Sequence, residues 1–270
     1  MTNQIIHGDC FEVMKSLSDN SFDAVITDPP YMTTDLHFDK IGFNVDLWLQ
    51  ECLRVLKPDA YLISFGSIEL LGKISTVFPI RWSGVWIKPS GVMRTHTAKK
   101  PMSKSEPYCV FAHPNHKISN LIFNKIKVYG YSPYKTIQRK SKYKRDGKDS
   151  LSRANSQGWT KDMYVCENDG FRWQTDVIEA PSKQYMTHAE RTDHPTQKPV
   201  KAIKTLIEMT TNKDNLILDP FGGSGTTAIA CLETGRNYVI IEQSLEYFTM
   251  INERVADWYE SKKTEQLELF

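Results

Sequence analysis

Long apolar runs and clustered cysteines are both missing from this 270-residue sequence. No stretch approaches the ~18 consecutive apolar residues that a membrane-spanning helix needs. The five cysteines (Cys10, Cys52, Cys109, Cys166 and Cys231) are odd in number and widely separated. That spacing is typical of reduced thiols in a cytoplasm and unlike a disulfide framework or a thiolate metal site. The sequence therefore predicts a cytoplasmic protein with no metal and no membrane contact, and an opening without a leader segment.

Internal repeats and low-complexity segments are missing too, and 40% apolar with 11% aromatic residues suffice for a packed core. The net charge of +2 hides an asymmetry. Residues 91–193 contain 19 Lys and Arg against 10 Asp and Glu, whereas the remainder contains 15 against 22. Positive charge confined to one segment is typical of a nucleic-acid-binding surface, and a solvated basic loop is the alternative.

The apolar run Phe22–Thr27 predicts a buried strand that stops at Asp28-Pro29-Pro30-Tyr31. Two prolines hold a stiff, extended path without backbone N–H groups. A carboxylate, a fixed carbonyl and an aromatic ring are thus presented together at the carboxyl end of a strand, where open α/β sheets bind ligands. A primary amine on a flat ring fits this trio, because Asp28 and the Pro29 carbonyl would each accept one N–H while Tyr31 stacks. A proline turn with Asp28 as a helix cap is the structural alternative.

A second predicted strand, Asn215–Asp219, leads into a glycine-rich loop and a helix. Glycines let the backbone approach a ligand, and the start of a helix offers unpaired N–H groups. A third strand, Val239–Ile241, ends at Glu242, an acid that would accept both ribose hydroxyls of an adenosine. No Lys follows the glycines, which excludes a phosphate-binding P-loop, whereas Gly223-x-Gly225-x-x-Ala228 matches the loose dinucleotide-binding pattern.

Together these stretches resemble the beta class of amino-group DNA methyltransferases, which bind S-adenosylmethionine. The order in which the catalytic tetrapeptide comes first and the cofactor loop last distinguishes this class from its relatives. The resemblance covers most of the chain and rests on six motifs: Gly8-Asp9-Cys10, Asp28-Pro29-Pro30-Tyr31, Glu51-x-x-Arg54-Val55-Leu56-Lys57-Pro58, Trp86-Ile87-Lys88, His194-Pro195-Thr196-Gln197-Lys198-Pro199, and Asp219-Pro220-Phe221-Gly222-Gly223-Ser224-Gly225-Thr226-Thr227.

The resemblance implies that the tetrapeptide Asp28, Pro29, Pro30 and Tyr31 is catalytic. Asp9 and Cys10 would touch the adenine of the cofactor, and Lys198 would lie near its methionine end. The structural alternatives are a helix cap by Asp9 and a surface lysine at a helix start. The full set of predicted cofactor contacts is Asp9, Cys10, Asp28, Lys198, Asp219, Phe221, Gly223, Ser224, Gly225, Thr226 and Glu242.

The predicted reaction is methyl transfer to an exocyclic amine in double-stranded DNA. Members of the family with Asp at the first position of the tetrapeptide mostly modify adenine, so the resemblance favours adenine. Cytosine is the alternative, since it presents an amine to the same clamp. Rivals from other classes are a dinucleotide-dependent oxidoreductase and a DNA-binding module whose catalytic fold has decayed. The sequence leaves open a homodimer, a restriction partner, and a bacterial or phage origin.

Alternating strands and helices predict an α/β fold with a doubly wound, mostly parallel sheet of seven strands, which the resemblance makes Rossmann-like. The strand over Tyr108–Ala112 should pair antiparallel with Trp82–Ile87 at the sheet edge. Residues 1–113 and 194–270 are predicted to form the catalytic and cofactor-binding parts of the core, and 114–193 a target-recognition insertion. Helices are expected over residues 46–56, 69–78, 200–210, 226–234 and 245–260. The predicted DNA contacts are Lys88, Arg139, Lys140, Lys142, Lys144 and Arg145.

Overall fold

The computed structural model describes residues 3–30, 43–92, 101–141 and 159–267. The chain divides into two compact units, a larger one of residues 1–125 with 175–270 and a smaller one of residues 126–174. The elements of the larger unit are β1 (Gln4–His7), α1 (Cys10–Lys15), β2 (Phe22–Thr27), α3 (Val45–Val55), β3 (Leu56–Phe65), α4 (Ile68–Ile74), β4 (Ile80–Val92), β5 (Ser103–Ala112), β10 (Val177–Glu179), the 3-10 turn η1 (Lys183–Tyr185), α5 (Val200–Thr210), β11 (Leu216–Asp219), α6 (Thr226–Thr234), β12 (Asn237–Glu242) and α7 (Leu245–Leu267).

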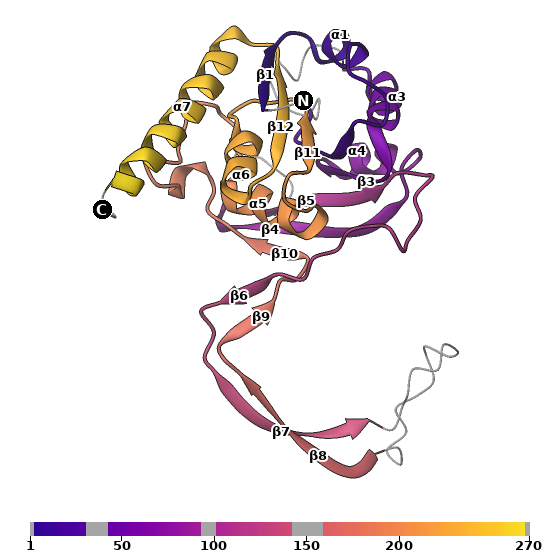
Figure 1. The fold of residues 1–270 in the computed structure, drawn as a ribbon, viewed down its shortest axis with the longest axis vertical. Helices are drawn as coiled ribbons and strands as arrows, with labels where there is room; N and C mark the ends of the chain where they lie inside the picture. Colours follow the sequence, from indigo (N-terminus) through magenta and orange to yellow (C-terminus); the bar gives the residue numbers. More distant parts are fainter. Residues whose placement is uncertain (1–2, 31–42, 93–100, 142–158, 268–270) are drawn as a thin grey trace. The chain divides into compact units, whose positions relative to one another are not determined.

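A sheet with the strand order β1-β12-β11-β2-β3-β5-β4-β10 forms the centre of the larger unit. Every pairing in it is parallel except those of β5, which runs antiparallel to both β3 and β4. Helices α1, α3 and α4 lie on one face and α5, α6 and α7 on the other (Figure 1). This confirms the doubly wound, mostly parallel α/β fold, because crossover helices between parallel strands cover both faces of a sheet.

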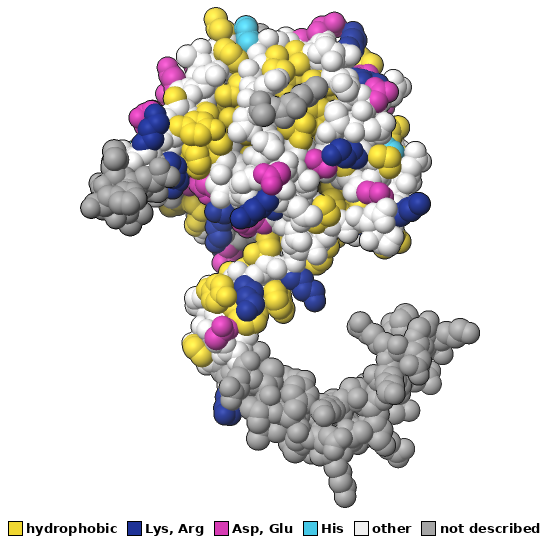
Figure 2. Space-filling view, viewed as in Figure 1, with side chains coloured by type: hydrophobic (Ala, Val, Ile, Leu, Met, Phe, Trp, Pro, Cys, Tyr) yellow, Lys and Arg dark blue, Asp and Glu magenta, His cyan; other side chains and the backbone are white. Residues whose placement is uncertain are grey.

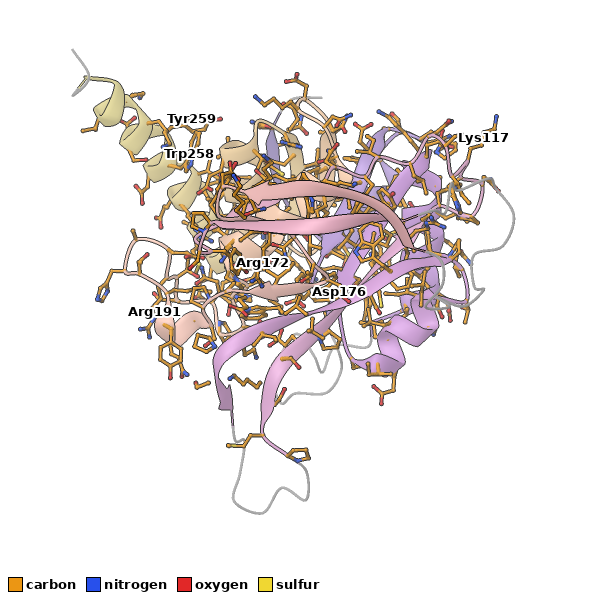
Figure 3. The ribbon with its side chains drawn as sticks, turned by 90° about the horizontal axis from the view of Figure 1, so that it is seen from below. Lys117, Arg172, Asp176, Arg191, Trp258 and Tyr259 are labelled. Carbon is orange, nitrogen blue, oxygen red and sulfur yellow. The ribbon has the colours of Figure 1, made fainter. Side chains whose placement is uncertain are left out.

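Two details of the predicted sheet are wrong. The described residues form eight strands rather than seven, and β5 lies inside the sheet because β4 and then β10 continue beyond it. The missed strand is the three-residue β10, which the carbonyl of Asp176 (labelled in Figure 3) sets against β4 by accepting the Val85 N–H at 3.0 Å and the Tyr108 hydroxyl at 2.9 Å. Three residues carry too little periodicity to predict a strand.

The predicted helices agree with the structure at most of their ends. Helices α5 and α6 have the predicted bounds, whereas α4 ends four residues earlier than expected and α7 runs on to Leu267. Helix α3 ends at Val55, and Pro58 lies within β3 rather than after the helix. The β2–β3 pairing shifts register between Leu56 and Tyr61, so the missing N–H of Pro58 falls where no printed pairing needs it.

The smaller unit consists of two antiparallel ribbons. Strand β6 (Lys127–Tyr129) pairs with β9 (Phe171–Trp173), and β7 (Tyr134–Ser141) pairs with β8 (Trp159–Asn168). This unit lies within the predicted insertion, whose flanks at 114–125 and 175–193 cluster with the larger unit. Across the described ranges, none of the helices combines the length and apolar character that a bilayer crossing requires.

Candidate functional site

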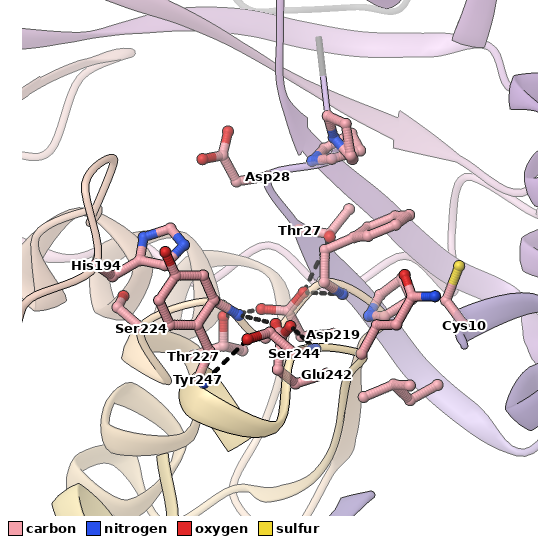
Figure 4. Close-up of a pocket in the computed structure, with 18 of the residues that line it drawn as sticks. Cys10, Thr27, Asp28, His194, Asp219, Ser224, Thr227, Glu242, Ser244 and Tyr247 are labelled. Atoms are coloured by element: carbon pink, nitrogen blue, oxygen red, sulfur yellow. Dashed lines mark hydrogen bonds between the residues drawn. The ribbon is translucent and has the colours of Figure 1, made fainter. Parts of the chain in front are cut away.

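Four neighbouring parallel strands, β1, β12, β11 and β2, end at the same edge of the sheet. The register pairs His7 with Glu242 and Leu218 with Val25, so the segments that follow these strands start side by side. They surround a pocket of about 650 Å³ (Figure 4). The carboxyl edge of a doubly wound sheet is where such folds bind ligands.

The pocket collects most of the predicted site residues, although they come from both ends of the chain. Tyr31 lies outside the described residues, and Gly225 is the N-cap of α6 at the end of the loop. The predicted residues that line the pocket are Asp9, Cys10, Asp28, Pro29, Pro30, Lys198, Asp219, Phe221, Gly223, Ser224, Thr226 and Glu242.

The glycine loop has the backbone conformation that its sequence predicts. Gly223 and Gly225 adopt φ values of +51° and +73°, in the left-handed region that side chains with a Cβ disfavour. A Cβ on Gly223 would also come within 3.1 Å of the His194 ring. Helix α6 begins at Thr226 without a side-chain cap, so the loop leaves the first N–H groups of this helix at the pocket.

Glu242 ends β12 and holds this loop in place. Its two carboxylate oxygens accept the N–H of Gly223 at 2.7 Å and the N–H of Ser244 at 2.8 Å. Burial raises the pKa of Glu242 in spite of these backbone N–H donors. An ionised carboxylate has about four acceptor positions, so two remain for a ligand.

Asp219 is buried and joins three segments around the pocket. Its carboxylate accepts the Thr27 hydroxyl at 2.9 Å, the Thr227 hydroxyl at 2.5 Å and the Phe221 N–H at 3.1 Å. Burial raises the pKa of Asp219 to about 7, against the opposing effect of these donors. The contacts make Asp219 a link between the end of β2, the loop and α6.

Lys198 is not a surface lysine at a helix start, so that alternative is wrong. Its side chain is 8% exposed and forms ion pairs with Asp28 and, at 3.3 Å, with Glu106. Burial would lower the pKa of Lys198, but the two carboxylates outweigh burial and raise it. The backbone carbonyl of Lys198 accepts the Thr226 hydroxyl at 2.9 Å, which ties it to the start of α6.

Glu106 is a pocket residue that the sequence did not predict. It lies in β5 and forms ion pairs with both Lys198 and Lys88. Burial alone would raise the pKa of Glu106, but the two ammonium groups offset burial and leave it below its ordinary value. Lys88 was predicted as a DNA contact, and the structure places its ammonium beside Glu106 with 13% of the side chain exposed.

The opposite end of the pocket is aromatic. Phe43 and Phe221 line it with ring centroids 5.3 Å apart, and both pack on the buried Trp48. Asp9 accepts the N–H groups of Phe11 and Glu12, which confirms that it caps α1. The neighbouring Cys10 is buried, and burial raises the pKa of its thiol to about 12, so the thiol is neutral near pH 7.

Three further residues support the site and had no role in the sequence prediction. The rings of His194 and Tyr247 lie 4.6 Å apart at the pocket wall, and burial lowers the pKa of His194 to about 4. Arg254 of α7 is largely buried and donates to the Ser224 carbonyl at 2.7 Å, the Thr226 hydroxyl at 3.2 Å and the Glu190 carbonyl at 3.2 Å. Helix α7 therefore fixes the glycine loop from outside.

The structure does not describe the side chains of the predicted basic cluster. The backbones of Arg139 and Lys140 lie in β7, while Lys142, Lys144 and Arg145 lie outside the described residues. Their prediction as DNA contacts is therefore untested. A search of the residues that the structure does describe finds no cluster of three or more His, Cys, Asp or Glu side chains able to hold a metal ion.

Comparisons with known proteins agree on one family. The family model described as DNA methylase (N6_N4_Mtase) matches residues 22–253. The DNA adenine methyltransferase YhdJ of Escherichia coli (strain K12) is 26% identical over 260 residues, which cover 91% of this chain and 80% of YhdJ. The crystal structure of the M1.HpyAVI-SAM complex is similar with a TM-score of 0.59 and 22% identity, covering 93% of this chain and 98% of that one. The PvuII DNA methyltransferase, described as cytosine-N4-specific, gives a TM-score of 0.61 at 14% identity and covers 94% and 86% of the two chains.

Proposed function

Because this chain belongs to the DNA methylase family, we propose that it transfers a methyl group from S-adenosylmethionine to the exocyclic amine of adenine at specific sites in double-stranded DNA. The observation that carries the proposal is the single pocket in which Asp28, Pro29 and Pro30 meet the glycine loop and Glu242. Two reactants held side by side in one pocket gain most of their acceleration from alignment. A dinucleotide-dependent oxidoreductase has no support from this family.

The pocket residues fit S-adenosylmethionine. This cofactor supplies a methyl group carried on a positively charged sulfur. Six acids line the pocket against one described lysine, Lys198, which favours a cationic ligand. Glu242 offers its remaining acceptor positions to ribose hydroxyls, and Phe43 and Phe221 supply an apolar surface for a flat base.

Asp28 and the Pro29 carbonyl bind the target amine by accepting one N–H each. These two acceptors favour a pyramidal nitrogen with its lone pair free, which offsets the delocalisation that makes the amine a poor nucleophile. Asp28 also receives the released proton, directly or through water. The target base leaves the duplex at a cost of ~a few kcal/mol, and Tyr31 returns ~1–3 kcal/mol by stacking on it.

The smaller unit lies in the insertion that we propose reads the target sequence. The register of β6 and β9 places Lys127 opposite Trp173 and Tyr129 opposite Phe171, on one face of the ribbon. The Lys127 ammonium lies 4.1 Å from the centre of the Phe171 ring. Hydrophobic and basic side chains adjoin on the part of this unit coloured in Figure 2. Such a surface suits DNA, because cations position phosphates and aromatic rings stack on bases.

Adenine is favoured by the Asp at position 28 and by the similarity to YhdJ, a DNA adenine methyltransferase. Cytosine is the second candidate, because the PvuII enzyme described as cytosine-N4-specific has the same fold. We place the reaction in the cytoplasm of a bacterium or a phage-infected cell, where free thiols such as those of Cys10, Cys52, Cys109 and Cys231 stay reduced. A homodimer remains a prediction.

The test is to incubate the protein with labelled S-adenosylmethionine and unmethylated plasmid DNA, then to digest the DNA and identify the labelled nucleoside. We expect N6-methyladenine, while N4-methylcytosine would establish the alternative. Asp28→Ala should abolish transfer while the protein still binds DNA, because only the amine clamp is lost. Retention of more than about a tenth of the wild-type turnover would remove Asp28 from the mechanism. Labelled DNA with neither product would refute the proposed function.

A further inference from the structure

The catalytic Asp28 is not isolated in the pocket but forms one end of a row of alternating charges. Its carboxylate pairs with Lys198, Lys198 pairs with Glu106, and Glu106 pairs with Lys88. The four charges come from four separate segments, after β2, before α5, in β5 and in β4. All four side chains are at most 27% exposed, so solvent screens their interactions less than it screens surface pairs.

The antiparallel direction of β5 explains how Glu106 reaches this place. Tyr108 of β5 pairs with Phe65, the last residue of β3. Glu106 therefore lies two residues beyond the end of β3, at the same sheet edge as Asp28. Its neighbour in β4 is Trp86, and Lys88 follows Trp86 by two residues on the same face of the sheet. This arrangement holds the Glu106 carboxylate between two ammonium groups.

The pairing with Lys198 poses a difficulty for the proposed function. Asp28 must accept an N–H of the target amine and then a proton, yet an ammonium group paired with it weakens a carboxylate in both tasks. A second carboxylate on the same ammonium group relieves this effect. Glu106 shares Lys198 with Asp28, and the Thr226 hydroxyl fixes the Lys198 backbone so that the ammonium lies between the two.

We propose that Glu106 is a positioning residue that draws the Lys198 ammonium away from Asp28 and so keeps Asp28 available to the target amine. This inference rests on the proposed function. The other titratable groups that face this row are Asp219, which is repelled by Asp28, and His194, which is repelled by Lys198. Both lie at the pocket and are the same in every variant below.

The decisive variant is Glu106→Gln, which keeps the shape of the side chain and removes its charge. The Lys198 ammonium then belongs to Asp28 alone. We expect kcat for methyl transfer to fall about tenfold or more, while calorimetry gives an S-adenosylmethionine affinity within about twofold of wild type. Glu106→Asp should recover part of kcat because the charge returns. Glu233→Gln is the matched control, since Glu233 pairs with Lys204 at the surface.

A second measurement does not depend on methyl transfer. The carboxyl carbon-13 signal of Asp28, assigned through its loss in Asp28→Asn, is followed by NMR as the pH changes. In Glu106→Gln we expect its titration to move about one pH unit lower, and in Lys198→Met to move higher, because an opposite charge favours the ionised carboxylate. The acid limb of the kcat profile should move in the same directions.

An unchanged Asp28 titration in Glu106→Gln would overturn the inference, whatever happens to kcat. A fall in kcat matched by an equal loss of cofactor affinity, with the titration in place, would likewise make Glu106 a merely structural group. A wild-type protein that methylates no DNA would refute the proposed function instead. The NMR titration would then still decide whether Glu106 controls Asp28.

Discussion

Glu242 has two tasks in the structure, and replacing it should affect folding and cofactor binding separately. Its carboxylate accepts backbone N–H groups from Gly223 and Ser244 at 2.7 and 2.8 Å. Hydrogen bonds to a charged group contribute ~1.5–3 kcal/mol each. Glu242→Ala removes both, and because the side chain is only partly buried we expect a loss of about 2–4 kcal/mol in the free energy of unfolding.

Urea denaturation measures the first task. With a slope of about 3 kcal/mol per molar urea, the expected loss moves the unfolding midpoint down by about 1 M. Glu242→Gln should lose about as much as Glu242→Ala or somewhat less, since an amide oxygen accepts one N–H while its NH₂ group faces the other donor. Glu246→Ala, which replaces an exposed acid of the same pocket, is the control. An unchanged midpoint in Glu242→Ala would refute the argument that this carboxylate holds the loop.

Calorimetry measures the second task. S-Adenosylmethionine affinity should fall by ~1.5–3 kcal/mol in Glu242→Ala, the usual value of hydrogen bonds to a charged group. Titrating at a urea-free temperature well below unfolding separates this loss from the loss in stability. If affinity is unchanged in the folded variant, Glu242 supports the loop but does not touch the cofactor.

Three further predictions follow from the same contacts. Asp219, with its pKa raised to about 7, stabilises the fold fully below its ordinary pKa near 3.8 and loses that contribution as the pH rises to 7; the stability of the wild type relative to Asp219→Asn should thus fall by up to about 4 kcal/mol between pH 4 and 8 in urea titrations, and a constant difference would contradict it. Arg254→Met should weaken S-adenosylmethionine binding about tenfold by calorimetry with Arg254→Lys intermediate, because the glycine loop loses its donors from α7, and equal affinities would show that the loop holds itself. Alanine at four basic positions of the insertion should flatten the dependence of log DNA affinity on log salt by about 0.9 per lost phosphate contact and leave cofactor affinity intact, whereas an unchanged slope would make the cluster a solvated surface. These positions are Arg139, Lys140, Lys142 and Lys144.

The sequence predicted the parts of the fold that local patterns control. Helix α6 begins after Gly225 and ends before Gly235, and both glycines have the positive φ that marks a helix boundary. The apolar run that forms β2 ends at the prolines as expected. Strand β10 was missed because backbone contacts with Asp176, a residue far from β4 in the chain, create it.

The site was predicted where motifs carry it and missed where only topology does. Asp28, Glu242 and the loop each follow a recognisable strand, so their meeting at one sheet edge could be expected. Glu106 stands alone before the apolar run of β5, and only the direction of that strand brings it to Lys198. The one available signal was a charged residue adjoining a strand that is otherwise buried, which is unusual without a partner.

The pairing of β1 with β12 has a consequence for how the protein is made. Residues 4–7 hydrogen-bond with residues 239–242, so the first strand has no neighbour in the sheet until almost the whole chain has been synthesised. Pairings between such distant residues are slow to form because loop closure must come first. A growing chain therefore carries the catalytic tetrapeptide long before it has anywhere to bind the cofactor. Methylation can begin only after translation has passed β12, and a ribosome stalled in the insertion would leave an inert product.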